Sequence, residues 1–299
     1  DIPDREPEVL LDGWGHEDTH ETLNSFTWGP DGWLYGCHGV FTHSKVGKPG
    51  TPENDRQKLN AGLWRWHPTE KKFEVWAHGT SNPWGADFDK YGEWFISACV
   101  IPHFYHLSEG GRYQRQGGQH FNPWTFGDIK TIADHAHYTG KLSDHAFWGA
   151  NSITRPAAPA DTSALGGGHA HSGLAIYSAD EFPVEYRGEA FFNNLHGHRL
   201  VREHLERSGS GYLARHRPDF LLTNNHEFIG VGVMQGTDGA LYFSDWADVQ
   251  TCHHRDVAAW DRSNGRIYRV RYGDAKTTAR KLPDRSDVEL VTALGDPNS

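Results

Sequence analysis

Two pairs of histidines have the spacing of metal ligands on a β-strand. One residue separates His169 from His171, and one residue separates His196 from His198. Alternate residues of a strand face the same side, which puts the imidazoles of a pair roughly 6.6 Å apart along the chain. Neutral imidazole is the commonest side-chain metal ligand, so the first three, with His198 as an optional fourth, predict a site for copper, zinc, manganese or iron. The alternative is that these histidines are loop residues that form hydrogen bonds with neighbouring carbonyl groups.

An acid and two imidazoles flank one expected hairpin. His20 and Glu21 precede its first strand, and His38 follows its second strand. Antiparallel pairing brings these ends together, and a carboxyl beside imidazoles suits general acid–base catalysis. We therefore predict that these three residues are catalytic. The alternative is a polar network that holds the edge of the sheet.

Cationic and amide side chains follow the strand expected at 94–101. They are Arg112, Arg115 and His120, with three glutamines between them. Such side chains suit an anionic or heavily hydroxylated sugar. We predict that they bind a cofactor or substrate together with His43 and His103, which also lie at strand ends. The alternative is a solvated loop.

The elements that must hold these residues are short β-strands. Apolar and aromatic runs alternate with turns of glycine, proline, aspartate and asparagine, and few windows keep a helical period. Three strand pairs, at 25–36, 83–96 and 236–245, enclose a turn that contains glycine. Units of hairpins that repeat about every 50 residues indicate the four-stranded blades of a β-propeller; a β-sandwich is the alternative.

The turn glycines set the expected spacing of these units. Gly32 and Gly92 are 60 residues apart, whereas Gly92 and Gly239 are 147 apart, which is roughly three units of 49. We therefore predict that the three glycines occupy equivalent hairpin turns on different blades. The histidines at positions 20, 38, 43, 103, 169, 171 and 196 lie at strand ends, so we expect them to converge on one mouth of the channel.

Two other segments depart from the strand pattern. Residues 46–60 are polar and predict a surface loop. Residues 102–168 are rich in histidine, arginine and tryptophan and predict a long insertion loop over one mouth of the propeller. The expected organisation is a propeller domain at 1–280 and a polar tail or linker at 281–299.

Composition and missing motifs exclude several classes of function. The formal net charge is −10, with no basic block, which argues against binding to nucleic acid or anionic lipid. No stretch approaches the roughly 18 apolar residues of a transmembrane helix. The chain has no CxxCH motif for covalent haem, no GxSxG elbow and no phosphate-binding glycine loop.

Five motifs follow one another in a fixed order. They are TWGPDGWLY at 27–35, AHGTSNPWG at 77–85, GLAIYSADEFPVEYRGEAFF at 173–192, DGALYFSD at 238–245 and GRIYRVRYG at 265–273. Their sequences and order resemble the glucose/sorbosone dehydrogenase-like β-propellers, a family that uses pyrroloquinoline quinone (PQQ). The segments 18–20, 23–25, 35–44 and 166–171 are most similar to the membrane-bound dehydrogenase propellers of planctomycete-type bacteria.

This resemblance implies a six-bladed, extracytoplasmic propeller, of which the chain is a partial or abbreviated form. It also implies a histidine base eight residues before the first glycine of the GPDG turn. Glu21 stands at that position, so either Glu21 is the base or a bulge places His20 there. The family arginine that contacts PQQ is replaced by Ser81. This replacement favours a divalent metal over PQQ as the cofactor.

The leading function is therefore oxidation of sugars or related alcohols in the periplasm or outside the cell, with electrons passed to a c-type haem domain or protein. One alternative is a metal-dependent propeller enzyme, such as a lyase, that acts on polysaccharide. The other is a non-catalytic propeller that binds carbohydrate or supports an assembly.

Overall fold

The computed structural model describes most of the chain. The described residues are 3, 5–19, 21–100, 102–115, 117–121, 126–134, 170–195, 197–225, 227–248, 256, 258, 260–273 and 285–293. All structural statements below concern these residues.

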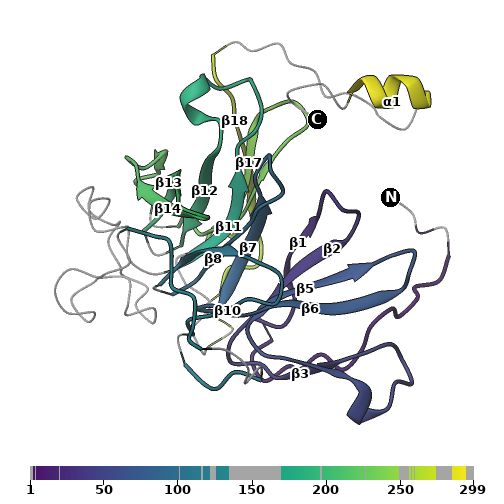
Figure 1. Cartoon of the computed structure of the whole chain (residues 1–299). Coiled ribbons are helices and arrows are strands. Elements are labelled where there is room, and N and C mark those ends of the chain that lie inside the picture. The colour runs from purple at the N-terminus through teal and green to yellow at the C-terminus, as the bar shows by residue number, and fades with distance from the viewer. Residues whose placement is uncertain are drawn as a thin grey trace.

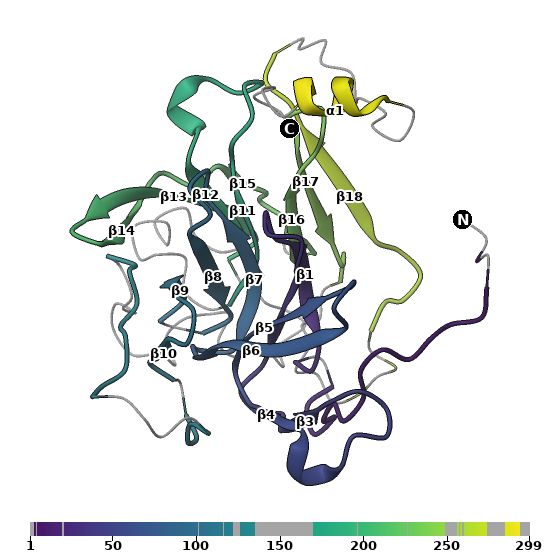
Figure 2. The same cartoon turned by 45° about the vertical axis from the view of Figure 1, so that its right-hand side comes forward.

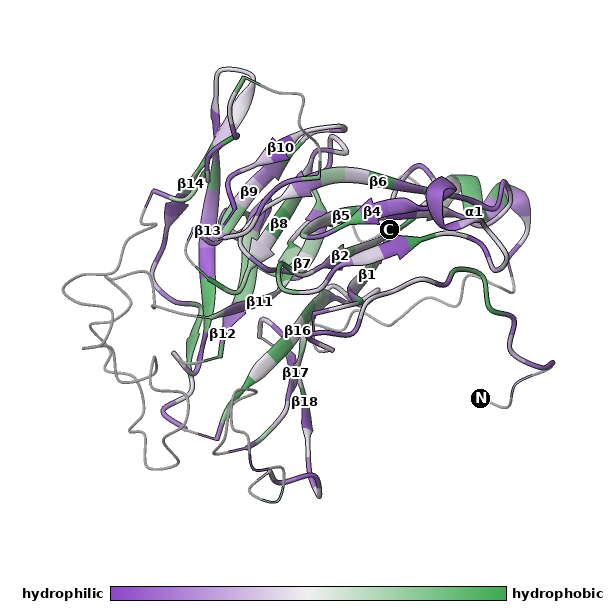
Figure 3. Ribbon diagram, turned by 90° about the horizontal axis from the view of Figure 1, so that it is seen from below, coloured by the Kyte–Doolittle hydropathy of each residue, from purple (hydrophilic) through white to green (hydrophobic). Residues whose placement is uncertain are grey.

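Four main β-sheets fan out side by side (Figures 1 and 3). The first contains β1 (Asn24–Trp28), β2 (Leu34–His38), β5 (Gly62–His67) and β6 (Lys72–Gly79), with β10 (Arg112–Tyr113) parallel to β6. The second contains β7 (Pro83–Phe88), β8 (Trp94–Ala98) and β9 (Phe104–Leu107). The third contains β11 (His171–Ile176), β12 (Glu189–Asn194), β13 (Arg199–Ser208) and β14 (Gly211–His216), and β15 (Leu221–Leu222) pairs with β13. The fourth contains β16 (Gly230–Gln235), β17 (Leu241–Asp245) and β18 (Arg266–Val270).

Small elements complete the described part of the chain. A two-stranded sheet pairs β3 (Ser44–Val46) with β4 (Gln57–Leu59), and two short 3₁₀ turns span Glu53–Asp55 and Val184–Tyr186. A single short helix, α1 (Asp287–Ala293), lies near the C-terminus.

Apolar residues fill the space between successive sheets. One cluster joins the first and second sheets through residues such as Leu63 and Trp94. The next cluster contains Phe95, the residue after Trp94, together with Phe192 of the third sheet. Successive side chains of a strand point to opposite faces. The second sheet is therefore buried on both faces. A third cluster of apolar residues fills the space between the third and fourth sheets. This layered arrangement confirms the predicted β-propeller fold.

The first strands of the four sheets, β1, β7, β11 and β16, form the inner edge of the fan (Figure 2). They approach closely at glycines. A Cβ atom on Gly85 of β7 would lie within 3.0 Å of the Gly173 carbonyl group in β11. A Cβ atom on Gly173 would in turn meet the backbone of residues 231–233 in β16. Backbone-to-backbone packing at these positions therefore leaves no room for a side chain.

The three turn glycines occupy equivalent hairpins, as predicted. Gly32, Gly92 and Gly239 join the first two strands of the first, second and fourth sheets, with φ of 80°, 78° and 77°. In each turn, the residue three positions before the glycine donates its backbone N–H to the carbonyl of the residue that follows the glycine, at 2.8 to 3.0 Å. Glycine adopts this left-handed conformation without the steric cost of a Cβ atom.

Two expected loops and the expected number of repeat units need correction. Residues 102–113 carry β9 and β10, because apolar residues at 104–107 complete the second sheet; of the rest of the expected loop at 102–168, the described residues at 114–115, 117–121 and 126–134 lie outside the strands. Residues 135–169 lie outside the described residues. Part of the loop expected at 46–60 pairs as β4. The described residues of the expected tail at 281–299 include α1, and the division into a propeller domain at 1–280 and a tail stays a prediction. The 147-residue interval spans two sheets rather than three units, because β7 contacts β11 and β11 contacts β16 directly.

A carboxylate links the second and third sheets. Asp87 accepts hydrogen bonds from the backbone N–H of Phe88 at 2.9 Å and of Ile176, in β11, at 2.7 Å. Burial raises the pKa of Asp87 to about 7. The carboxyl group therefore accepts a hydrogen bond across the two sheets, and burial makes its charged form unfavourable.

Asp87→Ala should lower the free energy of unfolding by about 2 kcal/mol, since it leaves the Ile176 N–H without its acceptor. Asp87→Asn keeps one acceptor oxygen and should cost less. The raised pKa means that wild-type stability falls as pH rises from about 4 to about 7, whereas the Asn variant should lack this contribution. Denaturant unfolding at several pH values measures both effects, and equal stability of the Ala variant and wild type would contradict the role of Asp87.

Candidate functional site at the loop end

The predicted chemistry-bearing residues gather at one end of the fan. The glycine turns lie at the opposite end, so the starts of β1, β7, β11 and β16 and the ends of β2, β8, β12 and β17 share what we call the loop end. A backbone hydrogen bond joins the segment that leads into each first strand to the residue after the second strand. The Gly39 N–H donates to the carbonyl of Glu21, three residues before β1, at 2.9 Å, and the Cys99 N–H donates to the carbonyl of Asn82, directly before β7, at 2.8 Å. Glu21 and Asn82 therefore occupy equivalent positions on neighbouring sheets.

Glu21 is a buried carboxyl group at the loop end. Its side chain is only 1% exposed, and its Oε2 accepts a hydrogen bond from the Phe41 N–H at 2.7 Å. Burial raises the pKa of Glu21 to about 7; the Phe41 N–H and the Asn82 side chain oppose this shift, while the charge of Asp18 adds to it. A carboxyl group that titrates near neutral pH is suited to take up and release a proton.

Gly39 allows the Glu21 carboxyl to reach its position. A Cβ atom on Gly39 would overlap Glu21 Cβ and would lie 2.6 Å from both Glu21 Oε2 and Asn82 Oδ1. The glycine thus opens the space in which the acid of the first sheet meets the amide of the second sheet.

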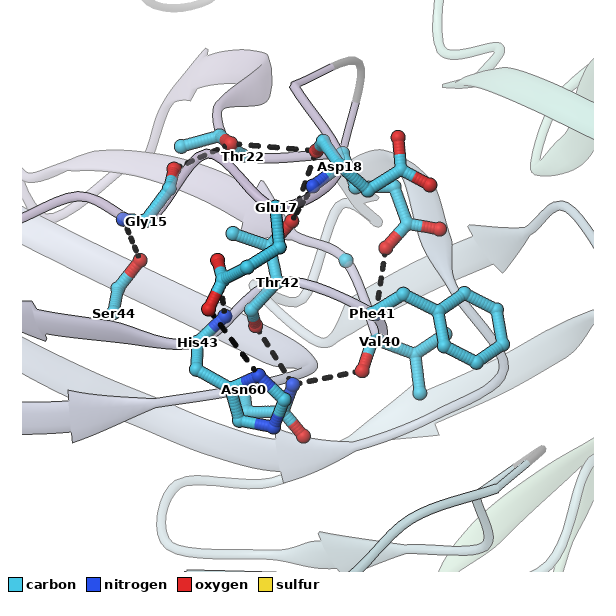
Figure 4. A network of polar contacts seen from close by, with 12 residues as sticks. Gly15, Glu17, Asp18, Thr22, Val40, Phe41, Thr42, His43, Ser44 and Asn60 are labelled. Carbon is cyan, nitrogen blue, oxygen red and sulfur yellow. Dashed lines mark hydrogen bonds and ion pairs between the residues drawn. The ribbon is translucent and has the colours of Figure 1, made fainter.

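A polar network braces the loop that follows β2 (Figure 4). Asn60 donates from Nδ2 to the carbonyl groups of Val40 and Thr42, both at 2.7 Å. The Thr42 hydroxyl donates to the Asp18 carbonyl at 2.8 Å. These hydrogen bonds hold residues 40–42 in place. They thereby position the Phe41 N–H, which donates a hydrogen bond to the Glu21 carboxylate.

A polar hollow of about 440 Å³ lies on the other side of Asn60. Its lining consists of Arg112, Gln114, Arg115, Gly117, Gly118, Gln119, His120 and Asp128. Three of the five predicted cofactor-binding residues, Arg112, Arg115 and His120, therefore meet in one place. Arg115 donates to Asn60 from both terminal nitrogens, at 2.7 Å to the backbone carbonyl and at short range to Oδ1.

The other two members of that predicted set lie apart from the hollow. The side chain of His43 is 60% exposed beside Glu17, and its ring centroid is 6.1 Å from that of Phe121. His103 is fully buried and stacks on His171, with ring centroids 4.0 Å apart and an interplanar angle of 19°. The structure thus joins His103 to a predicted metal ligand rather than to the arginines.

His38 has a supporting place in the fold. Its Nε2 is 2.7 Å from the Ser44 hydroxyl and its Nδ1 is 3.0 Å from the Gly39 carbonyl, and Trp14 stacks on the ring. Burial lowers the pKa of His38 to about 4, which keeps the ring neutral. Both nitrogens therefore bind within the fold, and a catalytic role for His38 remains a prediction.

Two of the four predicted metal ligands are described. His171 packs against His103, and His198 has Nδ1 2.7 Å from the Phe228 carbonyl. His169 and His196 lie outside the described residues, as does His20. Within the described part of the chain, no group of three or more histidine, cysteine, aspartate or glutamate residues has metal-binding geometry. The metal site and the convergence of all seven histidines therefore stay predictions.

Ser81 stands where the family resemblance implies an arginine that contacts PQQ. Its side chain is buried, and its hydroxyl lies 3.0 Å from the Tyr105 hydroxyl. Among the described residues, no guanidinium or ammonium group stands at this position to pair with an anionic quinone. The preference for a divalent metal over PQQ stays a prediction.

Sequence reasoning missed two residues of this site. Asn82 contacts Glu21 from the next sheet, and Asn60 joins the Glu21 loop to the arginines. Asn82 has φ of 61°, a conformation in which asparagine is enriched, but no motif around Asn60 signalled its role.

Comparison with known proteins supports the fold. The model of a family described as "Domain of unknown function (DUF7133)" matches residues 4–274. No curated protein matches the sequence. A structure described as an oxidoreductase (glucose dehydrogenase) of Thermus thermophilus is 19% identical, with a TM-score of 0.51; the match covers 88% of this chain and 69% of that one.

A second similar structure is the PQQ-bound aldose sugar dehydrogenase of Streptomyces coelicolor. It is 17% identical, with a TM-score of 0.47, and the match covers 83% of this chain and 61% of that chain. The present chain thus spans less than two thirds of the length of that protein. The described helices include none that is both long and apolar enough to span a membrane.

Proposed function

Since this chain belongs to the DUF7133 family and has a dehydrogenase-like propeller fold, we propose that it oxidises sugars or related alcohols. The observation that carries this proposal is the buried Glu21 carboxyl at the loop end, whose pKa is raised to about 7. A hydroxyl group of a bound substrate is a weak acid, and its oxidation needs a base that works near neutral pH.

Glu21 performs the proton transfer in this proposal. Its carboxylate takes the proton of the substrate hydroxyl, and the O–H electron pair forms the carbonyl bond as the adjacent C–H bond breaks. The hydrogen would leave with its electron pair to a bound quinone, which would be reduced by two electrons to the quinol, and a c-type haem partner would reoxidise the quinol one electron at a time. Asn82 and the Phe41 N–H orient the carboxylate, and Gly39 keeps its place open.

The propeller would work outside the cytoplasm, in the periplasm or as a secreted protein. This part of the proposal rests on the resemblance to extracytoplasmic sugar dehydrogenases. The formal net charge of −10 fits a small hydroxylated substrate better than a nucleic acid.

A dye-linked assay tests the function directly. Purified protein should reduce an artificial electron-acceptor dye in the presence of a sugar or polyol, with and without added PQQ or divalent metal. Dye reduction that depends on both protein and sugar is the expected result. Absence of dye reduction under every loading condition would reject the oxidoreductase. Unsaturated products from polysaccharide would then indicate a lyase, and binding without turnover would indicate a carbohydrate-binding propeller.

A further inference from the structure

Arg115 carries a positive charge that the described residues do not neutralise by contact. Its guanidinium group is half-buried, and its hydrogen bonds run to the carbonyl oxygens of Asn60 and Gly117 and to Asn60 Oδ1, all of which are neutral acceptors. Among the described residues, none brings a carboxylate within ion-pair distance of it. Burial lowers the pKa of Arg115, although the more distant charge of Asp128 partly opposes this shift. Burying a charge without a partner is unfavourable, so the site gains from an anion.

The one carboxylate among the described lining residues is already engaged elsewhere. Asp128 Oδ1 accepts from Arg112 Nε at 2.8 Å, and Asp128 Oδ2 lies 3.5 Å from His120 Nε2. Burial lowers the pKa of His120, which keeps its ring neutral at pH 7. Asp128 therefore balances Arg112, and the hollow retains the positive charge of Arg115.

The remaining lining is built for hydrogen bonds. A guanidinium group has five N–H donors, and the described residues accept from three of those on Arg115. Gln114 and Gln119 add side-chain amides, and the imidazole of His120, 10% exposed, adds a further polar group. A volume of about 440 Å³ has room for one monosaccharide-sized ligand.

From this arrangement we propose that the hollow is a binding site for an acidic sugar, whose oxyanion group pairs with Arg115 and whose hydroxyl groups bond to the glutamines and His120. Binding at this site requires neither electron transfer nor the Glu21 carboxyl. The binding proposal is therefore independent of the proposed oxidation, and its test measures binding alone.

Calorimetric titration at low salt with glucuronate and with glucose tests the proposal. Glucuronate should bind at least about tenfold more tightly than glucose, because charge-assisted hydrogen bonds are the stronger ones. Arg115→Gln should lose at least about tenfold in affinity, and Arg115→Lys should keep part of it. Arg217→Gln is the matched control, since Arg217 is an exposed arginine outside the hollow, and it should bind as wild type does.

Two further sets of measurements separate a loss of binding from a loss of folding and identify the preferred oxyanion. Asp128→Asn removes the opposing carboxylate and should tighten glucuronate binding several-fold, a gain that misfolding cannot produce. Glucose 6-phosphate and glucose 6-sulfate show whether the favoured oxyanion is a carboxylate, phosphate or sulfate. Equal affinity for glucose and glucuronate would overturn the proposal, as would unchanged affinity in folded Arg115→Gln. Inorganic phosphate that binds as tightly as every sugar derivative would overturn the sugar assignment.

Discussion

Replacing Glu21 by glutamine should lower the rate of sugar oxidation at least about a hundredfold, while the protein stays folded. Glutamine has nearly the same shape and still accepts a hydrogen bond from the Phe41 N–H, but it takes up no proton at neutral pH. The measurement is kcat and kcat/KM in the dye-linked assay, beside a thermal unfolding curve. Glu17→Gln is the matched control, because Glu17 is an exposed acid of the same loop region.

The dependence of kcat/KM on pH in the wild-type enzyme should follow the titration of the Glu21 carboxyl group. Its pKa is raised to about 7, so the fraction present as carboxylate, the form that acts as base, increases with pH up to about 7. We expect kcat/KM to rise about tenfold per pH unit below this value and to level off above it. The rise should be absent from the residual rate of the Gln variant. Wild-type rates in Glu21→Gln would exclude Glu21 as the base.

Stability should change with pH in the opposite direction. Because the folded-state pKa of Glu21 lies above the ordinary value of 4.5, the native protein holds the proton more tightly than the unfolded chain does. The contribution to stability is therefore full below about pH 4.5 and is lost as pH rises to about 7. A shift of this size corresponds to roughly 3 kcal/mol, which Glu21→Gln should remove from the pH dependence of unfolding.

Gly85→Ala should destabilise the fold by roughly 3 kcal/mol, and Gly85→Val should prevent stable folding. The Cβ atom of alanine would lie against the Gly173 carbonyl group and the Ser97 hydroxyl. The Gly173 backbone belongs to the next sheet and cannot rotate away as a side chain would. The second and third sheets would therefore separate along β7 and β11, across the apolar cluster that contains Phe95 and Phe192.

Gly127→Ala provides the control for Gly85→Ala. Among the described residues, no atom lies within 4 Å of a Cβ atom added at Gly127, so the effect of this substitution on stability should be within about 0.5 kcal/mol. Denaturant unfolding of the two variants gives the comparison. A Gly85→Ala protein as stable as Gly127→Ala would show that the inner strands tolerate greater separation than the packing indicates.

Local chemistry made the hairpins predictable. The turns at Gly32, Gly92 and Gly239 depend on residues next to each other in the chain, and each forms the same hydrogen bonds in the structure. Apolar alternation in the flanking strands then indicated sheets with buried faces, and the repeated unit indicated a propeller. The number of units between Gly92 and Gly239 was wrong, because the third unit is longer than the others. Gly188, with φ of 79°, closes its hairpin with the same hydrogen bonds, but residues 178–187, which include the 3₁₀ turn Val184–Tyr186, are inserted before it, and a long stretch of chain separates β10 from β11.

The sequence by itself determined which residue types lie at strand ends: Glu21 before β1, His103 before β9 and the arginines near β10. Only the tertiary structure decided which of them meet. Glu21 acquires its raised pKa from burial beneath residues 39–41 and beside Asn82, and His103 pairs with His171 across two sheets. Arg115 meets Asn60, 55 residues earlier in the chain. Such contacts arise from the packing of one sheet on the next, whose geometry depends on many side chains at once and leaves no local pattern in the sequence.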